Sequence, residues 1–404
     1  MLTRRAPLEI LLAGSLPPYP GGSAVANYRL LSAWARAGHG VRALGPATAK
    51  DRAAASAFDA AHPAPVLTRY EVPYVTADAV GEWLSAEQRR SQRAALRRVF
   101  DELVAQVRPD IVLIARGDLL LDVPEVAAAH AVPWAVIQHG AVVHGLRDGA
   151  FPDALRDEYL RRFAEGSAVI TATRHMARDL HELGCSPVHI VPNPVDVDHF
   201  RPCPPDAALR RALGIPDGAS VVLHASNMKA CKRVLDLVDS AAAVMERRPQ
   251  TVYLVAGDGP GREAMERRAA QLGIGAGMRF AGWIAQDALP DYMNLADVVV
   301  MPSEVENQSL VYLEACACAR ALLASDIPGA RETLRDGETG MLFRKGDVED
   351  LTAKTVHLLA DGALRERLGR SAREAVGVHA SDAVAEAYAE ILSGIVTAPA
   401  ARRP

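Results

Sequence analysis

The stretch MPSEVENQSLVYLEACACARALLASDIPGARETLRDGETG, residues 301–340, decides how this chain folds. An apolar run over residues 297–301 leads into it, and a helical pattern begins near residues 307–309. An apolar run, a turn and a helix in this order predict one strand–helix unit of an α/β sheet. Glu306 and Glu314 bracket seven residues at that turn. Because open α/β sheets bind ligands at the carboxyl ends of their strands, we expect a binding site here.

The two carboxylates have a functional and a structural interpretation. Helix N-terminal amides attract a diphosphate, Glu306 is placed to accept hydrogen bonds from sugar hydroxyls, and Glu314 suits the vicinal hydroxyls of a ribose. Alternatively, Ser303-x-x-Glu306 fits a capping box, in which Glu306 only caps the helix. On spacing alone the capping box is the commoner meaning of the pattern, so the wider sequence has to decide.

Composition excludes several classes of protein. The chain has 404 residues, half of them hydrophobic, which suggests two domains with a core each. Its 45 basic and 49 acidic residues lack the basic excess of a nucleic-acid binder, so no nucleic-acid partner is expected. Five cysteines, two of them in the spacing Cys316-x-Cys318, do not match a zinc motif and are interpreted as reduced thiols.

We expect a cytoplasmic protein. Glu9 interrupts the apolar stretch near the N-terminus, which predicts a first buried strand rather than a signal peptide. The sequence contains no run of about 18 apolar residues, so no membrane span is predicted. The helical stretch 85–108 is rich in arginine, and we favour an ordinary solvated helix over contact with an anionic membrane, which remains the alternative.

Strand and helix patterns alternate in both halves of the chain, which predicts two doubly wound parallel sheets. A proline-rich segment between the halves is incompatible with a helix or a central strand. We therefore predict an N-terminal domain over residues 1–194, a linker over 195–205, and a C-terminal domain over 206–378. Residues 379–404 should form a helix that returns to the first domain.

Four further segments are candidates for ligand contact. Lys229 and Lys232 stand beside Asn227 after a predicted strand, where they would neutralise a diphosphate or form a solvated helix start. Gly21 and Gly22 precede a helix, either to let a ligand approach the backbone or as a plain turn. His139 ends a buried strand, where a histidine is more often structural. A last candidate is Gly257, in a Gly-Asp-Gly-Pro loop.

Taken together, these motifs resemble the signature of glycosyltransferase family 4. The family pattern is Pro-Ser, Glu-x7-Glu, a small-residue helix, Gly-x-x-Glu and Asp-Gly-x-x-Gly, here Gly329 to Glu332 and Asp336 to Gly340 in its last two parts. The resemblance implies a GT-B fold, with two Rossmann-like domains facing across a cleft. Asn307-Gln308-Ser309 stands where the family has an aromatic residue and glycine. The basic segment 226–233 is similar to that of members that transfer N-acetylglucosamine to malate.

The resemblance assigns expected roles to particular residues. The catalytic residues would be Glu306, Lys232 and His139, with His139 touching the donor sugar. The expected donor-binding residues are Gly21, Gly22, Asn227, Lys229, Gly257, Asn307, Gln308, Ser309, Leu310 and Glu314. The family's arginine falls near Ser226 and Asn227, so Lys229 would replace it. By position alone, Arg116, His144 and Arg147 are expected to contact the acceptor.

The resemblance also implies the reaction. A sugar would pass from a nucleoside diphosphate, UDP favoured and GDP as the alternative, to a small-molecule acceptor with retention of configuration and no cofactor. Asp196-x-Asp198 belongs to the family's linker pattern, so no metal is expected. The chain would act as a monomer or homodimer. An epimerase or phosphorylase of the same fold is the second enzyme hypothesis, and a two-domain sugar-binding protein is the hypothesis without catalysis.

Overall fold

The computed structural model describes residues 6–19, 21–47, 52–62, 65–71 and 86–398. The chain divides into two compact units. Unit 1 comprises residues 1–194 and 381–404, and unit 2 comprises residues 195–380. Among the described residues, no helix combines the length and the apolar character that crossing a bilayer requires.

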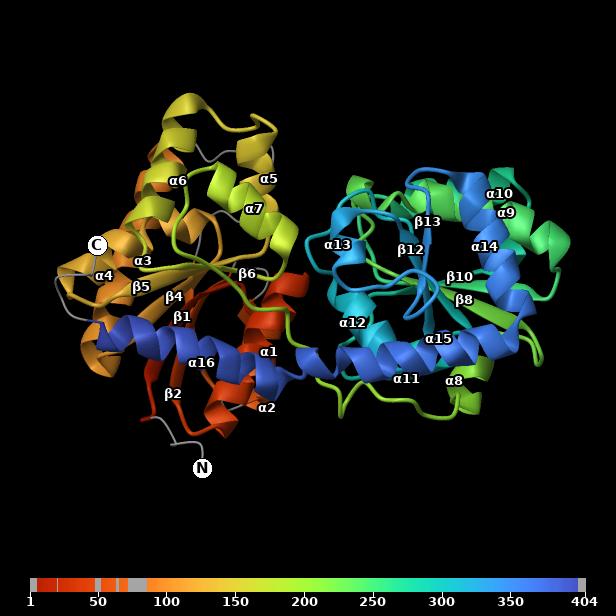
Figure 1. Cartoon of the computed structure of the whole chain (residues 1–404), viewed down its shortest axis with the longest axis horizontal. Coiled ribbons are helices and arrows are strands. Elements are labelled where there is room, and N and C mark those ends of the chain that lie inside the picture. Colours follow the sequence, from red (N-terminus) through yellow and green to blue (C-terminus); the bar gives the residue numbers. More distant parts are fainter. Residues whose placement is uncertain (1–5, 20, 48–51, 63–64, 72–85, 399–404) are drawn as a thin grey trace. The chain divides into compact units, whose positions relative to one another are not determined.

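Unit 1 is built on a sheet that has seven parallel strands within its described part, in the order β3-β2-β1-β4-β5-β6-β7 (Figure 1). The strands are β1 (Glu9–Gly14), β2 (Gly40–Ala47), β3 (Val66–Glu71), β4 (Ile111–Ala115), β5 (Trp134–Gln138), β6 (Val169–Thr171) and β7 (Val188–Ile190). The helices are α1 (Gly22–Arg36), α2 (Arg52–Ala61), α3 (Ala86–Val107), α4 (Val123–Ala129), α5 (Ala141–Arg147), α6 (Asp153–Glu165), α7 (Arg174–Glu182) and α16 (Ser381–Thr397), with a 3-10 turn at Asp118–Leu121.

Alternation along the strands produces two cores in unit 1. Leu11 of β1 joins a core with Phe100 of α3 and Phe163 of α6, whereas its neighbour Leu12 faces a second core with Trp34 of α1. Successive strand residues point to opposite faces, so helices are needed on both sides of the sheet. The sequence therefore reads as near-continuous apolar runs in β1 and β4, which are buried on both faces.

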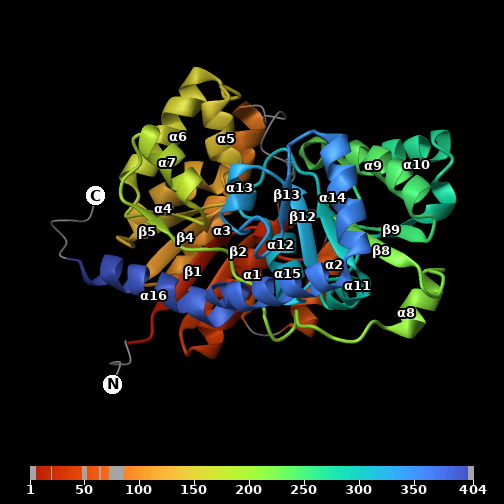
Figure 2. The ribbon, with the colours of Figure 1, turned by 45° about the vertical axis from the view of Figure 1, so that its right-hand side comes forward.

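Helix α16 completes the second of these cores, although it follows all of unit 2 in the chain. It packs alongside α1 (Figure 2). The rings of Trp34 and Tyr388 meet edge to face with centroids 5.8 Å apart, and the Trp34 indole N–H donates to the carbonyl of Ala385. Arg36 pairs with Asp382 at the surface.

Unit 2 has a second sheet, with six parallel strands among the described residues in the order β10-β9-β8-β11-β12-β13. The strands are β8 (Ser220–Ala225), β9 (Thr251–Ala256), β10 (Met278–Gly282), β11 (Val298–Met301), β12 (Ala321–Ser325) and β13 (Met341–Phe343). The helices are α8 (Ala207–Ala212), α9 (Val234–Arg247), α10 (Arg262–Gln271), α11 (Leu289–Leu295), α12 (Leu310–Ala317), α13 (Pro328–Arg331), α14 (Val348–Ala360) and α15 (Gly362–Ala375), with 3-10 turns at Ala230–Lys232, Gly275–Gly277 and Val376–His379.

These two parallel sheets confirm the predicted fold class. In both sheets the strand order reverses between the first strand and the fourth, at β1/β4 and β8/β11. Loops leaving neighbouring strands diverge at such a point, which leaves room for a ligand at the carboxyl edge. The carboxyl ends of β8 and β11 carry the residues that the sequence singled out in unit 2.

The proline-rich segment 195–205, predicted as the linker, packs with unit 2. The Arg373 guanidinium donates to the carbonyls of Val197 and Phe200, and Phe200 is fully buried. Proline removes backbone donors, but the carbonyls of this segment still accept hydrogen bonds from a side chain. The chain passes between units at 194/195 and again at 380/381.

Candidate active site

Glu306 and Lys232 meet at the carboxyl edge of the second sheet. Lys232 Nζ donates to Glu306 Oε1 at 2.5 Å, and Ser303 Oγ donates to the same oxygen at 2.8 Å. The Lys232 and Glu306 side chains are 16% and 10% exposed, so water screens the pair little. The contact joins residues 74 positions apart and unites two motifs that the sequence presented separately.

Electrostatics keep this ammonium charged. Burial lowers the pKa of Lys232, but the attraction of Glu306 and its hydrogen bond outweigh burial, so the pKa lies above its ordinary value. A charged ammonium held beside a carboxylate is a ready partner for the developing negative charge of a phosphate leaving group. Lys232 does not lie on α9 as the sequence suggested, because a 3-10 turn over Ala230–Lys232 precedes that helix.

Glu306 is not a helix cap. Helix α12 begins at Leu310 with Ser309 as its N-cap residue, so a capping box that starts at Ser303 has no helix to cap. The Ser303 hydroxyl instead orients the Glu306 carboxylate. The backbone N–H of Glu304 donates to the carbonyl of Cys231 at 2.7 Å, which ties the Glu306 loop to the turn that carries Lys232.

Gly329 explains the Gly-x-x-Glu part of the motif. A Cβ atom at this position would lie 2.1 Å from the carbonyl oxygen of Glu306 and 2.5 Å from that of Asn307. Only glycine lets the first turn of α13 approach this backbone so closely. Gly329 therefore lets α13 pack against the Glu306 loop, a role that the sequence analysis did not assign.

The turn at residues 226–229 follows β8 and is fixed by a glycine loop. A Cβ on Gly257 would lie 1.9 Å from the Ser226 carbonyl, and one on Gly259 would lie 1.8 Å from the Asn227 carbonyl. Gly257 is thus required for backbone packing, whatever else it contacts. Among the described residues, Asn227 Oδ1 has no hydrogen-bond partner although it is shielded from water, which marks an acceptor available to a ligand.

The other residues of unit 2 that the sequence predicts to bind the donor cluster at the start of α12. Asn307, Gln308, Ser309 and Leu310 are all buried, and Ser309 makes no side-chain cap to the helix. The Ser309 side chain therefore does not occupy the first amides of α12. Glu314 lies one turn further on and is 1% exposed. Lys229 borders the 3-10 turn, and its carbonyl accepts the N–H of Lys232 at 2.9 Å.

In unit 1, His139 follows β5 and is oriented by a residue that the sequence analysis missed. His139 Nε2 lies 3.2 Å from Asn27 Oδ1, and Asn27 Nδ2 donates to the Ser15 carbonyl at 3.0 Å. Because the Ser15 contact makes Oδ1 the acceptor, His139 donates from Nε2 and leaves Nδ1 unprotonated. Burial lowers the pKa of His139 to about 4, so the imidazole is neutral near pH 7.

Other predicted residues lie at the same edge of the first sheet. Gly21 has a φ of 140° and is the N-cap of α1, and Gly22 is the first residue of that helix, which carries no side-chain cap. Arg116, just after β4, donates to Asp118 at 2.7 Å and lies over the Tyr19 ring, 5.6 Å from its centroid. The structure therefore brings the glycine loop, β4 end and β5 end to one edge of unit 1.

His144 and Arg147 lie on α5, and their surroundings favour a structural role. Arg147 Nη1 pairs with Asp179 of α7 at 2.5 Å, so this ion pair joins two helices. The pKa of His144 is lowered mainly by burial, which keeps the ring neutral. Neither the ion pair of Arg147 nor the burial of His144 indicates contact with an acceptor.

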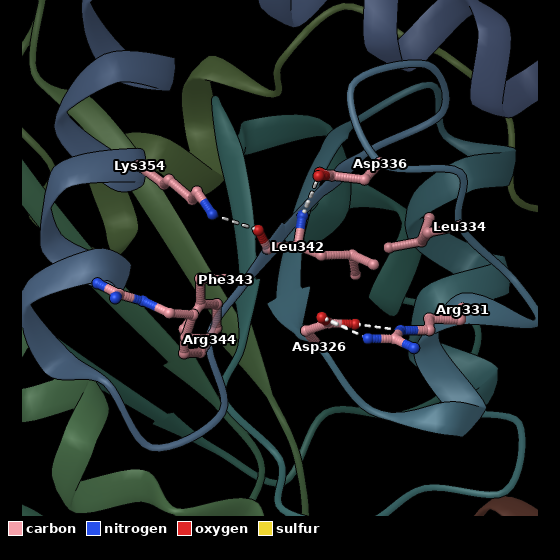
Figure 3. A pocket seen from close by; sticks show the side chains of 8 residues that line it. All are labelled: Asp326, Arg331, Leu334, Asp336, Leu342, Phe343, Arg344 and Lys354. Atoms are coloured by element: carbon pink, nitrogen blue, oxygen red, sulfur yellow. Dashed lines mark hydrogen bonds and ion pairs between the residues drawn. The ribbon is translucent and has the colours of Figure 1, made fainter.

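A charged cleft of about 360 Å³ lies beside β12 and β13 (Figure 3). Its lining residues are Asp326, Arg331, Leu334, Asp336, Leu342, Phe343, Arg344 and Lys354. Arg331 forms a two-bond ion pair with Asp326, and Lys354 donates to the carbonyl of Leu342. Asp336 accepts the backbone N–H of Leu342, and Arg344 and Lys354 both pair with Asp350. None of these charged groups belongs to the predicted site.

The Asp196-x-Asp198 pattern is a turn. Asp196 Oδ1 accepts the backbone N–H groups of Asp198 and His199, at 3.1 and 2.9 Å. Within the described part of the chain, no group of three or more His, Cys, Asp or Glu side chains could hold a metal ion. All five cysteines are free thiols.

Family models match both halves of the chain. Residues 20–199 match the model described as Glycosyltransferase Family 4, and residues 206–375 match Glycosyl transferases group 1. The chain belongs to glycosyltransferase family 4. This confirms the resemblance that the motifs carried, from the Glu-x7-Glu pair to the Gly-x-x-Glu turn.

Individual family members are similar over much of the chain. The D-inositol 3-phosphate glycosyltransferase of Streptomyces avermitilis is 30% identical over 287 residues, 68% of this chain and 61% of that protein. The N-acetyl-alpha-D-glucosaminyl L-malate synthase of Bacillus anthracis is 29% identical over 228 residues, 55% of this chain and 58% of that protein. The chain thus spans about three fifths of the length of these curated relatives.

Solved structures support the same fold. Anabaena Alr3699/HepE, in complex with UDP and glucose, superposes with a TM-score of 0.78. The two sequences are 18% identical, and the match covers 96% of this family 4 chain and 99% of the Anabaena chain. At this identity the likeness concerns the fold, which is GT-B.

Proposed function

We propose that this family 4 protein is a glycosyltransferase that moves a sugar from a nucleoside diphosphate to a small-molecule acceptor. The observation that carries the proposal is the contact of Lys232, Glu306 and Ser303 at the carboxyl edge of the second sheet. A cation for the diphosphate and an oriented carboxylate for sugar hydroxyls are the two groups that such a donor needs.

The roles follow from chemistry and position. Lys232, with Lys229 nearby, offsets the charge that builds on the leaving diphosphate, and the amides at the start of α12 add to this. Glu306 accepts hydrogen bonds from the donor sugar, and Glu314 accepts them from the ribose. His139 contacts the sugar from unit 1 as a neutral imidazole, with Nδ1 as the acceptor.

Exchange of single side chains tests this assignment. Glu306→Ala and Lys232→Ala should each lower turnover at least about tenfold, roughly 1.4 kcal/mol of transition-state stabilisation. Glu338→Ala is the matched control, because this glutamate is 67% exposed and pairs only with Arg335 at the surface among the described contacts. Normal kinetics in both site variants would remove the site assignment.

The donor nucleotide can be identified by stability. A ligand that binds only the folded protein raises its melting temperature, so UDP-, GDP-, ADP- and TDP-sugars can be compared in one thermal-shift panel. We place a UDP-sugar first and a GDP-sugar second. The names of the relatives suggest inositol phosphate and malate as first acceptors to supply, since both are small anionic molecules with hydroxyl groups.

We further propose that the reaction retains the anomeric configuration and needs no metal. Retention would follow a front-face attack in which the donor phosphate takes the acceptor proton. Proton NMR of the fresh product distinguishes α from β linkage. Turnover that survives EDTA supports metal independence, and turnover that returns only with Mg²⁺ or Mn²⁺ refutes it.

A further inference from the structure

A buried histidine supports the turn at residues 226–229 from inside unit 2. His224 lies near the end of β8 and is 0% exposed. Its Nδ1 lies 2.9 Å from the carbonyl oxygen of Val300 in β11, and its Nε2 lies 2.8 Å from Ser226 Oγ. Ser226 Oγ in turn lies 3.1 Å from the backbone nitrogen of Met228.

These partners determine the direction of each hydrogen bond. The Val300 carbonyl only accepts, so His224 donates from Nδ1 and keeps Nε2 free of a proton. The Ser226 hydroxyl therefore donates to His224 Nε2 and accepts from the N–H of Met228. Burial lowers the pKa of His224 to about 4, so the ring holds this neutral tautomer near pH 7.

The chain of hydrogen bonds holds a turn that would not be stable alone. Met228 has a φ of 49°, a left-handed conformation that side chains with a Cβ rarely adopt. The backbone of Gly257 and Gly259 packs against the same turn, and the N–H of Gly261 donates to the Met228 carbonyl at 2.9 Å. The Ser226 hydroxyl and the glycine loop thus both hold the turn, which sets the conformation of Asn227 and Lys229.

We propose that His224 is a positioning residue that acts through Ser226 to hold Asn227 and Lys229 in the conformation that binds the donor diphosphate. This inference rests on the proposed function. In this chain Ser226 and Asn227 stand where the family pattern has an arginine, and the Ser226 hydroxyl is occupied by His224 and Met228. Ser226 therefore contributes geometry rather than charge, and the charge is left to Lys229 and Lys232.

Three substitutions test the hydrogen bonds from Val300 through His224 and Ser226 to Met228. His224→Asn keeps a donor at the position of Nδ1 for Val300 but removes the acceptor for Ser226. His224→Gln can place its carbonyl oxygen where Nε2 was and so accept from Ser226 again. Ser226→Ala removes the hydroxyl and leaves the interior of the sheet unchanged, so it serves even if His224→Asn does not fold.

The measurement is titration calorimetry of the full chain with UDP, GDP, ADP and TDP, together with melting temperatures. We expect His224→Asn and Ser226→Ala to weaken binding of the preferred nucleoside diphosphate at least about tenfold, and the double variant to be no weaker than either. His224→Gln should stay within about threefold of the wild type. Ser240→Ala, a buried serine of α9 that bonds Thr352, should lower the melting temperature without changing affinity.

The outcomes distinguish the two levels of the argument. If the wild type binds none of UDP, GDP, ADP and TDP, the proposed function fails and this inference fails with it. If the wild type binds, but Ser226→Ala and His224→Asn bind as tightly, only the positioning role is refuted. The same holds if His224→Gln is as weak as His224→Asn, since the role then lies in the imidazole itself rather than in the acceptor.

Discussion

The ion pair of Lys232 and Glu306 couples function to stability. Both side chains are largely buried, so removing one partner leaves a charge without its counterion. We expect Lys232→Met to lower the free energy of unfolding by about 3 kcal/mol in urea denaturation. Adding Glu306→Gln to it should restore part of that loss. A double variant less stable than Lys232→Met would contradict the pairing.

Two buried histidines predict how stability depends on pH. Burial lowers the pKa of His139 and His224 to about 4, against an ordinary value of 6.5. Between these values the unfolded chain binds more protons than the folded chain, so stability falls as the pH falls from 6.5 towards 4. Full protonation of His224 should cost about 3 kcal/mol.

Urea unfolding at pH 7, 6, 5 and 4.5 measures this slope. His224→Gln, which has no group that titrates in this range, should show a shallower slope than the wild type. An unchanged slope would mean that His224 is not held neutral. Well above pH 6.5, where His224 of the wild type is neutral in both the folded and the unfolded chain, the two proteins should respond to pH alike.

A site residue could be predicted from the sequence where it belongs to a recognisable motif. It could not be predicted where only its contacts in the folded chain identify it. The Glu-x7-Glu spacing and the basic segment pointed to Glu306 and Lys232. Their mutual contact was not visible, because it spans 74 residues and depends on two loops leaving neighbouring strands. Asn27 was missed for the same reason, since a polar residue within a helical pattern does not reveal that it faces a histidine 112 positions away.

At the scale of elements, α13 and the Glu306 loop depend on each other through close packing. Gly329→Ala would place a Cβ 2.1 Å from the Glu306 carbonyl, so the loop must shift and turnover should fall at least about tenfold. Gly394→Ala is the matched control. It lies in α16 with open space around it, and alanine there should stabilise the helix by up to about 1 kcal/mol.

Steady-state kinetics with saturating acceptor and a denaturation curve for each glycine variant make this comparison. A Gly329→Ala protein with normal turnover would show that the loop tolerates the shift. Stability measured alongside separates a damaged site from a damaged fold, because α13 is short and carries little of the core.

Long buried strands and amphipathic helices were the elements that the sequence predicted well. The apolar run IVLIA forms β4, Ile111–Ala115, because a short apolar run bounded by turn residues is consistent with a fully buried strand. Strand β13 has three residues, which is too short for any periodicity to show. The turn at Lys232 looked helical in sequence, yet Arg233 adopts a left-handed conformation with a φ of 48° and delays the start of α9.

At the scale of the molecule, unit 1 depends on a helix that follows unit 2 in the sequence. Tyr388 of α16 is 3% exposed and meets Trp34, so Tyr388→Ala should destabilise unit 1 by about 3 to 5 kcal/mol. Val378→Ala, at a side chain 68% exposed, should change little. Native-state hydrogen exchange resolves the units, and the effect of Tyr388→Ala should appear in residues 8–44 before residues 220–256.

The position of α16 in the chain also sets the order in which the protein can form on the ribosome. All of residues 195–380 are synthesised before α16 is translated. Until then, the face of Trp34 and Leu30 that α16 covers lacks this helix, although both residues precede unit 2 in the chain. Unit 1 is therefore completed after unit 2, and its nascent apolar face is where chaperones should bind during synthesis.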